Sequence, residues 1–305
     1  MAELQTNTVM ANDVEFAYLA AGGDDPSSPL ALCLHGFPDT AHTWRHLLPA
    51  LANAGFRAVA PFQRGYAPTQ IPADGCYQSG ALAVDANSLH QALGGDDMAI
   101  VIGHDWGAVA AHGAAVLEPD RWRRVATMAV PPGSALALSF LTNLTQVQNS
   151  WYMFFFQHAL ADMVVPANDL AFIDMLWSQW SPGYDAKVDL SLVKDALRDP
   201  NNLAAALGYY RATLGSGRRD ERYAGAQSAT QESPTQPTLY LHGRDDGCVA
   251  VEVAQSAATM LPSNVALEIV DNTGHFLHLE QPQIVNARIV EFLTHVEERG
   301  VPRYA

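Results

Sequence analysis

The sequence predicts an α/β fold in which a mostly parallel sheet is flanked by helices on both faces. Short, continuous apolar runs bounded by turn residues recur along the chain, as expected for strands buried on both faces of a sheet. Between these runs the apolar residues take helical spacing, as at Leu82, Leu89 and Leu93. Regular alternation of the two patterns is typical of strands connected by helices and favours a parallel sheet.

Seven apolar runs are the candidate strands. Six of them are expected to be parallel, namely Leu30–Leu34, Ala58–Pro61, Met98–Ile102, Val125–Val130, Thr238–Leu241 and Val265–Val270. The seventh, Val14–Leu19, is expected to be an antiparallel edge strand.

The alternation of strands and helices breaks between residues 133 and 217. This stretch is rich in aromatic residues and Met, and its pattern predicts helices without strands. A helical insertion between two strands of an open sheet would lie over their carboxyl ends, where ligands bind. We therefore predict a core formed by residues 1–132 and 218–305 and a helical cap formed by residues 133–217.

Composition narrows the range of partners and compartments. The net charge is −15 and no run of Lys or Arg occurs, so neither nucleic acid nor an anionic membrane surface is expected to bind. Three scattered cysteines suit a reducing cytoplasm better than a disulfide framework or a zinc site. Neither a signal peptide nor a membrane-spanning run is evident, so we expect a cytoplasmic protein without a membrane partner; a homodimer is compatible with the sequence.

Residues 103–107, Gly-His-Asp-Trp-Gly, follow a predicted strand and precede a helix rich in small residues. A sharp strand-to-helix turn strains its central residue, and Gly103 and Gly107 would relieve the crowding on either side. The central residue is Asp105. A carboxylate attacks amides poorly but can displace a leaving group at a saturated carbon, which leaves an ester on the enzyme. Alternatively, Asp105 only caps the following helix.

A second turn would supply backbone donors for this reaction. Residues 35–38, His-Gly-Phe-Pro, follow an early strand. The backbone N–H of Phe37, together with that of Trp106, would form an oxyanion hole for the intermediate on Asp105.

A base and its orienting acid are expected after the last two strands. His275 comes last in the chain, after a glycine, and is the candidate general base. Residues 243–246, Gly-Arg-Asp-Asp, offer two acids that could orient it. The Gly-X-X-Asp spacing favours Asp246 over Asp245, and the other acid would be a turn residue or a helix cap.

Together these motifs resemble the α/β-hydrolases that comprise the epoxide hydrolases and haloalkane dehalogenases. The resemblance covers most of the chain, and the combination of motifs is specific. It implies the α/β-hydrolase fold, with a helical cap over the sheet. The segments that carry it are His35-Gly-Phe-Pro, Arg64-Gly-Tyr, Gly103-His-Asp-Trp-Gly-Ala, Gly243-Arg-Asp-Asp and Gly274-His-Phe-Leu-His-Leu-Glu-Gln-Pro.

In the epoxide hydrolases of this family, two cap tyrosines hydrogen-bond the epoxide oxygen. Residues 150–157 resemble the first tyrosine segment, which implies this role for Tyr152. Residues 208–211 resemble the second, where Tyr210 is favoured over Tyr209. The leaving epoxide oxygen develops negative charge, so a positioned proton donor is needed. The alternative is that these tyrosines only pack the cap.

The sequence therefore predicts an epoxide hydrolase that opens a small apolar epoxide to a vicinal diol and consumes water. The first alternative is a haloalkane dehalogenase, in which Trp106 and a cap tryptophan, Trp177 or Trp180, hold the halide. Phe37 counts against that variant, because some dehalogenases have Asn at this place. The second alternative is a ligand-binding protein of the same fold without turnover.

The surroundings of the site can also be predicted. No metal or organic cofactor is expected, because the sequence contains no His-Glu-X-X-His pattern, phosphate-binding loop or dinucleotide fingerprint. His104 is expected to pack beneath the turn of Asp105, and His278 to lie in the pocket wall or at the surface. The side chains expected to line the substrate pocket are Phe37, Trp106, Trp151 and Phe276.

Overall fold

The computed structural model describes residues 4–23, 25 and 27–295. Within them the chain forms one sheet of eight strands in the order β1-β2-β4-β3-β5-β6-β7-β8. Both ends of the predicted core, residues 1–3 and 296–305, lie outside the described residues. The strands are β1 (Gln5–Ala11), β2 (Val14–Ala21), β3 (Leu30–Leu34), β4 (Arg57–Pro61), β5 (Ile100–His104), β6 (Arg124–Met128), β7 (Thr238–Gly243) and β8 (Val265–Val270).

The six strands from β3 to β8 are parallel, as predicted. Strands β3 and β5 lie at the centre and are fully buried, which explains their unbroken apolar runs. The strand β8 at one edge is only half-buried along its length. The α/β fold predicted from the alternation of strands and helices is thus confirmed.

The prediction for β2 was right in direction but wrong in position. The strand is antiparallel to β4, but it is not at the edge, because β1 pairs with its other side. A two-residue turn at Asn12 and Asp13, both with positive φ (45° and 59°), connects β1 to β2. Such a turn matches the twist of a hairpin. The polar sequence of β1 conceals it, because an outer strand need not be apolar on both faces.

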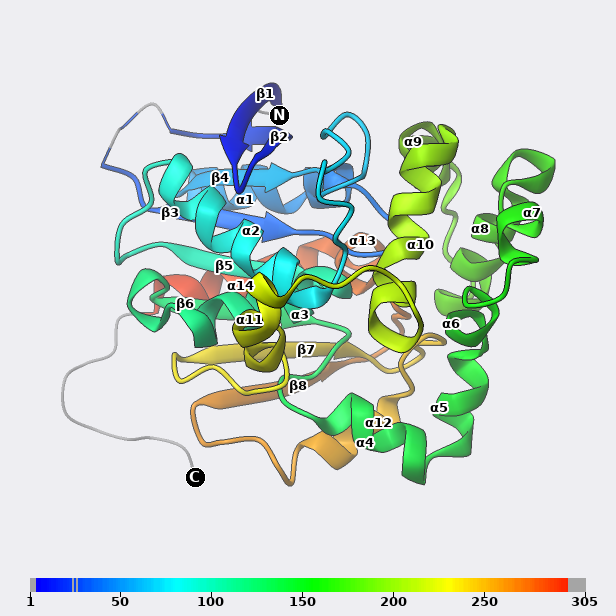
Figure 1. Ribbon diagram of the computed structural model, residues 1–305. Helices are drawn as coiled ribbons and strands as arrows, with labels where there is room; N and C mark the ends of the chain where they lie inside the picture. The colour runs from blue at the N-terminus through cyan, green and yellow to red at the C-terminus, as the bar shows by residue number, and fades with distance from the viewer. Residues whose placement is uncertain (1–3, 24, 26, 296–305) are drawn as a thin grey trace.

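Helices cover both faces of the sheet (Figure 1). The helices α2, α3 and α11 pack together on one face, and α1 and α14 pack together on the other. The helices of the core are α1 (Leu47–Asn53), α2 (Ser79–Ala92), α3 (Trp106–Leu117), α11 (Ala224–Ala229), α12 (Val251–Ala257), α13 (Leu277–Glu280) and α14 (Pro282–Thr294). Among the described residues, none of the helices combines the length and the hydropathy that crossing a bilayer requires.

A helical insertion, residues 135–214, separates β6 from β7 and contains no strand within this fully described stretch. It stands beyond the carboxyl ends of the parallel strands (Figure 1). Contacts with the loops that follow these strands hold it there: the Trp177 indole N–H donates to the carbonyl of Pro38, and Tyr209 donates to that of Arg64. Its helices are α4 (Ala135–Thr142), α5 (Leu144–Asn149), α6 (Trp151–Phe155), α7 (Ala161–Val164), α8 (Ala167–Trp180), α9 (Lys187–Leu197) and α10 (Pro200–Leu214).

Candidate active site

The turn between β5 and α3 forms a strained elbow with Asp105 at its tip. Asp105 has φ 54° and ψ −121°, a backbone conformation that residues other than glycine rarely adopt. A Cβ on Gly103 would collide with the backbone of Gly107, and a Cβ on Gly107 would collide with the carbonyl of Leu34. The two glycines therefore permit the elbow, and Asp105 makes no side-chain capping bond to the helix that it begins.

Backbone donors converge on the Asp105 carboxylate from two loops. The N–H of Phe37 donates to Oδ1 at 2.8 Å, and the N–H of Trp106 also hydrogen-bonds this carboxylate. The loop after β3 can approach so closely because Gly36 has no side chain; a Cβ there would overlap the Asp105 carboxylate. The two N–H groups expected to form an oxyanion hole thus both face Asp105.

His275 lies on the other side of the carboxylate. Its Nε2 is 3.7 Å from Asp105 Oδ2, and its Nδ1 is 3.0 Å from Asp246 Oδ2. The ring is fully buried, and the backbone N–H of His275 donates to the carbonyl of Trp180 at 2.9 Å. Within the described residues Nε2 has no hydrogen-bond partner, so it is free to accept a proton.

The loop after β7 separates the two candidate acids by exposure. Asp246 is buried, and its Oδ1 accepts the backbone N–H groups of Cys248 and Val249 at 2.7 and 2.9 Å. These two bonds leave Oδ2 directed to His275. Asp245 is exposed and binds through its backbone to Thr273. The geometry therefore brings Asp246 to His275 and leaves Asp245 in the turn.

Burial and charge shift the protonation of these groups. Burial raises the pKa of Asp105, against the opposing effects of His275 and of the two N–H groups. Burial alone would lower the pKa of His275, but the charge and hydrogen bond of Asp246, together with the charges of Asp105 and Glu280, outweigh it, and the pKa is raised from 6.5. An imidazole whose protonated form is stabilised by a neighbouring carboxylate is suited to accept a proton.

Two tyrosine rings from the insertion meet above the elbow. Tyr152 on α6 and Tyr210 on α10 are both buried, and their ring centroids lie 5.5 Å apart. The Tyr210 ring also contacts Trp106 edge-on, at 5.2 Å between centroids. Burial raises the pKa of both phenols well above 10, and the charge of Asp105 adds to this shift in each case. Both hydroxyls therefore carry a proton at neutral pH.

The hydroxyls of the three candidate tyrosines have different partners. Tyr209 donates to the carbonyl of Arg64 at 2.8 Å and stacks on Tyr77, so its hydroxyl is engaged in structure. The buried hydroxyl of Tyr210 lacks a hydrogen-bond partner in the described chain. The hydroxyl of Tyr152 has only the sulfur of Cys248, at 3.4 Å. Tyr152 and Tyr210 are thus the pair whose hydroxyls are available to a ligand.

Three of the four predicted pocket side chains surround this point. Phe37 contacts Tyr210 edge-on, and Phe276 contacts the ring of His275. Trp106 lies beside Tyr210, as described above. Trp151 does not lie with these side chains. It is 38% exposed and packs on Phe155 and Phe172 at the outer side of α6. The helix turns Tyr152 inward, so its neighbour in sequence points away.

His104 and His278 are both buried next to the site. His104 lies beneath the elbow and its Nε2 pairs with the backbone carbonyl of His275 at 2.9 Å. His278 is neither exposed nor beside Asp105; it stacks on Trp44 and its Nε2 lies 2.6 Å from the Thr43 hydroxyl. The sequence pattern did not distinguish a buried from an exposed position for His278.

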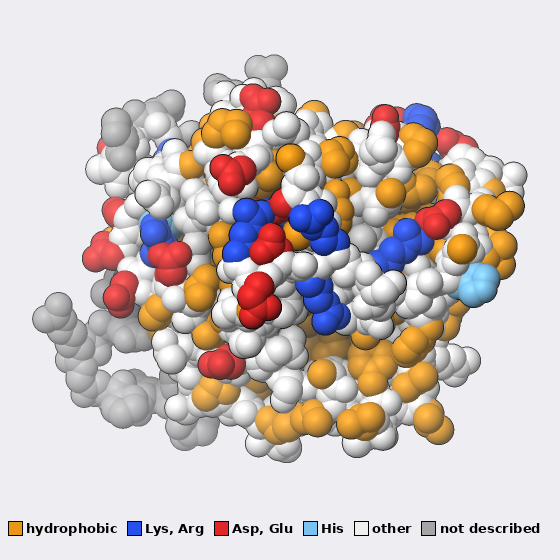
Figure 2. Space-filling view, in the orientation of Figure 1, with side chains coloured by type: hydrophobic (Ala, Val, Ile, Leu, Met, Phe, Trp, Pro, Cys, Tyr) orange, Lys and Arg blue, Asp and Glu red, His pale blue; other side chains and the backbone are white. Residues whose placement is uncertain are grey.

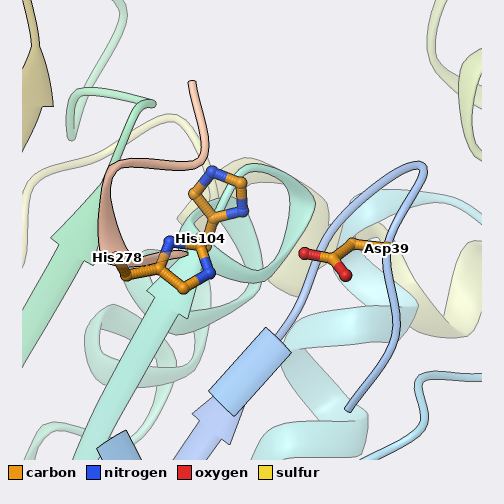
Figure 3. A group of neighbouring side chains, drawn as sticks. All are labelled: Asp39, His104 and His278. Atoms are coloured by element: carbon orange, nitrogen blue, oxygen red, sulfur yellow. The ribbon is translucent and has the colours of Figure 1, made fainter. Parts of the chain in front are cut away.

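Two groups of residues combine side chains of the kinds that ligate metals. In one, the Asp39 carboxylate faces the rings of His104 and His278 (Figure 3), with potential ligand atoms within 4.8 Å of one another. Burial raises the pKa of Asp39 to about 8 and lowers that of His278 to about 3. The other group is Asp105, Cys248 and His275.

Cys248, Gln146 and Glu280 contribute to the site without having been given a role from the sequence. Gln146 on α5 donates to the carbonyl of Cys248 and accepts from the N–H of Ala250, which ties the insertion to the loop of Asp246. Glu280 accepts the N–H of Gly274 at 2.8 Å, just before His275. A position two residues after Asp246 is the only sequence signal that points to Cys248.

Comparisons with known proteins agree with this arrangement. A sequence profile of the α/β-hydrolase fold matches residues 29–282. The chain belongs to the α/β-hydrolase fold family. Its resemblance to this family, first seen in the motifs, is thereby confirmed, as is the fold class.

Several of its relatives within the α/β-hydrolases are epoxide hydrolases. The chain is 28% identical to epoxide hydrolase A of Mycobacterium tuberculosis, covering 95% of this chain and 98% of the relative. It is 30% identical to an epoxide hydrolase of Caballeronia sordidicola over 89% of each chain. Among solved structures, epoxide hydrolase A of Mycobacterium thermoresistibile has a TM-score of 0.76 at 26% identity, over 97% of this chain and 99% of the other.

Proposed function

We propose that this α/β-hydrolase opens small apolar epoxides to vicinal diols. The observation that carries the proposal is the convergence of three kinds of group at one buried point. A carboxylate stands on the elbow, a histidine with a free Nε2 lies beside it, and two tyrosine hydroxyls lie above it. The names of the relatives support the same substrate class. In this proposal the insertion serves as the cap over the site.

The two oxygens of Asp105 have different environments, which suggests different roles. Oδ1 accepts the N–H of Phe37, whereas Oδ2 faces His275. In the first step Oδ2 attacks an epoxide carbon from the side opposite the C–O bond. The carbon–oxygen bond breaks, and the departing oxygen takes a proton from Tyr152 or Tyr210. The product of this step is an ester between Asp105 and the substrate.

Hydrolysis of the ester uses the same groups in a second way. His275 Nε2 accepts a proton from water, and the resulting hydroxide attacks the Asp105 carbonyl carbon. Negative charge then develops on Oδ1, which already accepts the N–H of Phe37, and the N–H of Trp106 lies at the same carboxylate. Asp246 stabilises the imidazolium that forms. Collapse of this intermediate releases the diol, whose departing oxygen takes the proton from His275, and the carboxylic acid left at Asp105 returns its proton to the tyrosine.

The geometry is less favourable for a haloalkane dehalogenase. That reaction needs two N–H donors for the halide, one from Trp106 and one from a tryptophan of the insertion. The indole N–H of Trp177 donates to the Pro38 carbonyl at 2.9 Å, so this candidate is already engaged. The other candidate, Trp180, lies at the site, with its ring centroid 5.1 Å from that of His275. A phenolic proton also has no role in halide departure, although two phenols occupy the site.

A direct assay distinguishes the three candidate functions. The purified protein is incubated with a panel of small epoxides and a panel of haloalkanes, and diol and halide are measured. Diol formation is expected from the epoxides, and its absence together with halide release would overturn the proposal. Mass spectrometry of a single turnover tests the ligand-binding alternative, because only an enzyme gives an adduct at Asp105.

A further inference from the structure

The outer side of the helical insertion exposes an extended apolar surface. Four consecutive helices, α4 to α7, contribute to it, and they form one border of the molecule at the right of Figure 1. Two of its residues, Leu141 and Leu144, are among the most exposed large side chains described, at 84% and 86%. We call this surface the apolar border; its members are Leu138, Leu141, Leu144, Trp151, Phe154, Leu160, Met163 and Val164.

The helices α4, α5 and α6 of the apolar border adjoin one another. The ring of Phe140 on α4 contacts that of Phe154 on α6 edge-on, at 6.2 Å between centroids. The exposed leucines near the α4–α5 junction therefore adjoin the aromatic residues of α6. Soluble monomers rarely expose contiguous apolar patches beyond a few hundred Å². If a fully exposed large side chain presents about 180 Å², the border exposes on the order of 800 Å², which is what one partner contributes to a standard interface.

The border is also poor in charge, and Asp162 on α7 is the one charged residue within its helices. No Asp, Glu, Lys or Arg occurs between Arg124 and Asp162, whereas the whole chain carries 32 acidic and 17 basic residues. Figure 2 shows orange and white atoms, without blue or red, at its lower right, where α4 and α5 lie. Depletion of charge and enrichment in aromatic residues and Met are typical of the centre of a protein–protein interface.

We propose that the apolar border is the interface of a homodimer, formed by α4–α7 of two copies of this chain. Two molecules with a net charge of −15 repel each other over most of their surfaces. Apart from Asp162, which pairs with Arg211 at 2.7 Å, the border is a face on which they can meet without burying a charged side chain, whose desolvation would be costly. A twofold arrangement places the same border on both sides of the contact.

The charge pattern favours a second copy over a lipid surface. Helices that lie on membranes present Lys or Arg beside their apolar side chains, which anionic headgroups attract. Here no Lys or Arg occurs between Arg124 and Lys187, and the one charged residue within the helices of the border is Asp162. The inference does not depend on which substrate the enzyme takes, because no residue of the border belongs to the site.

The dimer would stabilise one wall of the site. Tyr152 lies on α6 and Gln146, which binds the loop of Cys248, lies on α5. Both helices contribute to the border through their outer sides. A contact between two copies would therefore restrain the helices that carry these two inward-facing side chains.

Sedimentation equilibrium of the full chain over a range of concentrations tests the proposal. The wild-type protein is expected to dimerise at micromolar concentration, and more tightly as salt screens the repulsion between the two negative copies. Leu144→Asp, and separately Leu144→Lys, should weaken dimerisation at least about 100-fold, because either substitution buries an unpaired charge. The matched controls are Val188→Asp on α9 and Ile284→Asp on α14, which are also exposed, at 65% and 57%, and should remain dimeric.

Three outcomes would overturn the proposal. One is a wild-type monomer at all concentrations. Another is a dimer that the Leu144 variants leave intact, or one that Val188→Asp weakens as much as the Leu144 variants do. The third is a monomer that floats with phosphatidylcholine vesicles and loses this binding with Leu144→Asp, which would assign the border to lipid. Circular dichroism and thermal unfolding of each variant confirm that it is folded; a substitution at an 86%-exposed side chain should leave both unchanged.

Discussion

The core and the insertion hold their polar side chains at the site in different ways. In the core, Asp246 accepts two backbone N–H groups and the Asp105 carboxylate accepts the N–H of Phe37. In the insertion, Tyr210 is buried without a hydrogen-bond partner among the described residues and Tyr152 has only a thiol. The core thus fixes its reactive groups before a substrate arrives, whereas the insertion keeps donors uncommitted.

This difference has a physical reason. In the proposed reaction the core groups hold charge, and preorganised dipoles stabilise charge without the cost of reorientation. A tyrosine that gives its proton to a substrate must not have given it to the protein. An unpartnered buried hydroxyl is normally unfavourable, so its presence at Tyr210 indicates a place where a ligand satisfies it. Substitutions in the core and in the insertion should therefore have different consequences.

Loss of the nucleophile should have the largest effect. Asp105→Ala removes the atom that attacks the substrate, so no ester can form and turnover should fall at least about 10⁴-fold. Diol formation from an epoxide is the measurement. The protein should remain folded, because Asp105 makes no capping bond to α3. Turnover within tenfold of the wild type would show that Asp105 is not the nucleophile.

Loss of the base should separate the two steps. His275→Gln leaves Asp105 free to attack but removes the proton acceptor, so ester hydrolysis should slow about 10²–10⁴-fold. Intact-mass measurement after mixing with an epoxide should then show an adduct of the substrate mass on nearly every molecule. If this variant turns over rapidly without an adduct, another group activates the water.

The three tyrosines offer a matched comparison within the insertion. Tyr210→Phe and Tyr152→Phe should each lower turnover about 10–10³-fold, and the double variant more, because one donor can partly replace the other. Tyr209→Phe is the control: it should leave turnover nearly unchanged but cost about 1–3 kcal/mol of stability, since the buried carbonyl of Arg64 loses its donor.

Activity and thermal unfolding of the single variants measure both effects. Because the Tyr210 hydroxyl has no partner in the described chain, Tyr210→Phe should not lower stability. If Tyr209→Phe impairs turnover more than Tyr210→Phe, the assignment of the two neighbours is reversed.

The pH dependence of ester hydrolysis tests the roles proposed for His275 and Asp246 in the core. The base must be unprotonated, and the raised pKa of His275 extends its protonated form to higher pH. The rate of ester breakdown should therefore rise about tenfold per pH unit and level off at a midpoint above 6.5. Asp246→Asn removes the carboxylate that raises this pKa, so the midpoint should move downward. If the midpoint does not move, the Asp246 carboxylate does not raise the pKa of His275.

Cys248 should give the smallest effect. Its thiol is a weak hydrogen-bonding group, and Cys248→Ala removes the one partner of the Tyr152 hydroxyl. A change in turnover of about 2–5-fold is expected, as for a weak hydrogen bond. Steady-state kinetics of Cys248→Ala and of the double variant with Tyr152→Phe would show whether the thiol acts through Tyr152. If the alanine substitution still matters when the phenol is gone, the thiol acts by another route.

Much of the fold followed from local patterns. The apolar runs predicted β3 and β8 with the bounds that the structure has, although only β3 is buried on both faces and β8 is half-buried. The elbow was visible because only glycine fits beside Asp105. The strand β1 was missed, because an outer strand with polar residues carries no such signal. Trp151 was placed in the pocket because a motif gives the segment but not the side of the helix on which each residue lies.

The sequence by itself determined the α/β class of the fold and the chain order of Asp105, the two candidate acids and His275, while the resemblance of its motifs pointed to the α/β-hydrolases. These depend on backbone constraints and apolar periodicity, which act over a few residues. Only the tertiary structure decided which acid reaches His275, which tyrosine keeps a free hydroxyl, and that Cys248 meets Tyr152. Those contacts join residues far apart in the chain, and their choice depends on which hydrogen bonds the packed elements leave unmade.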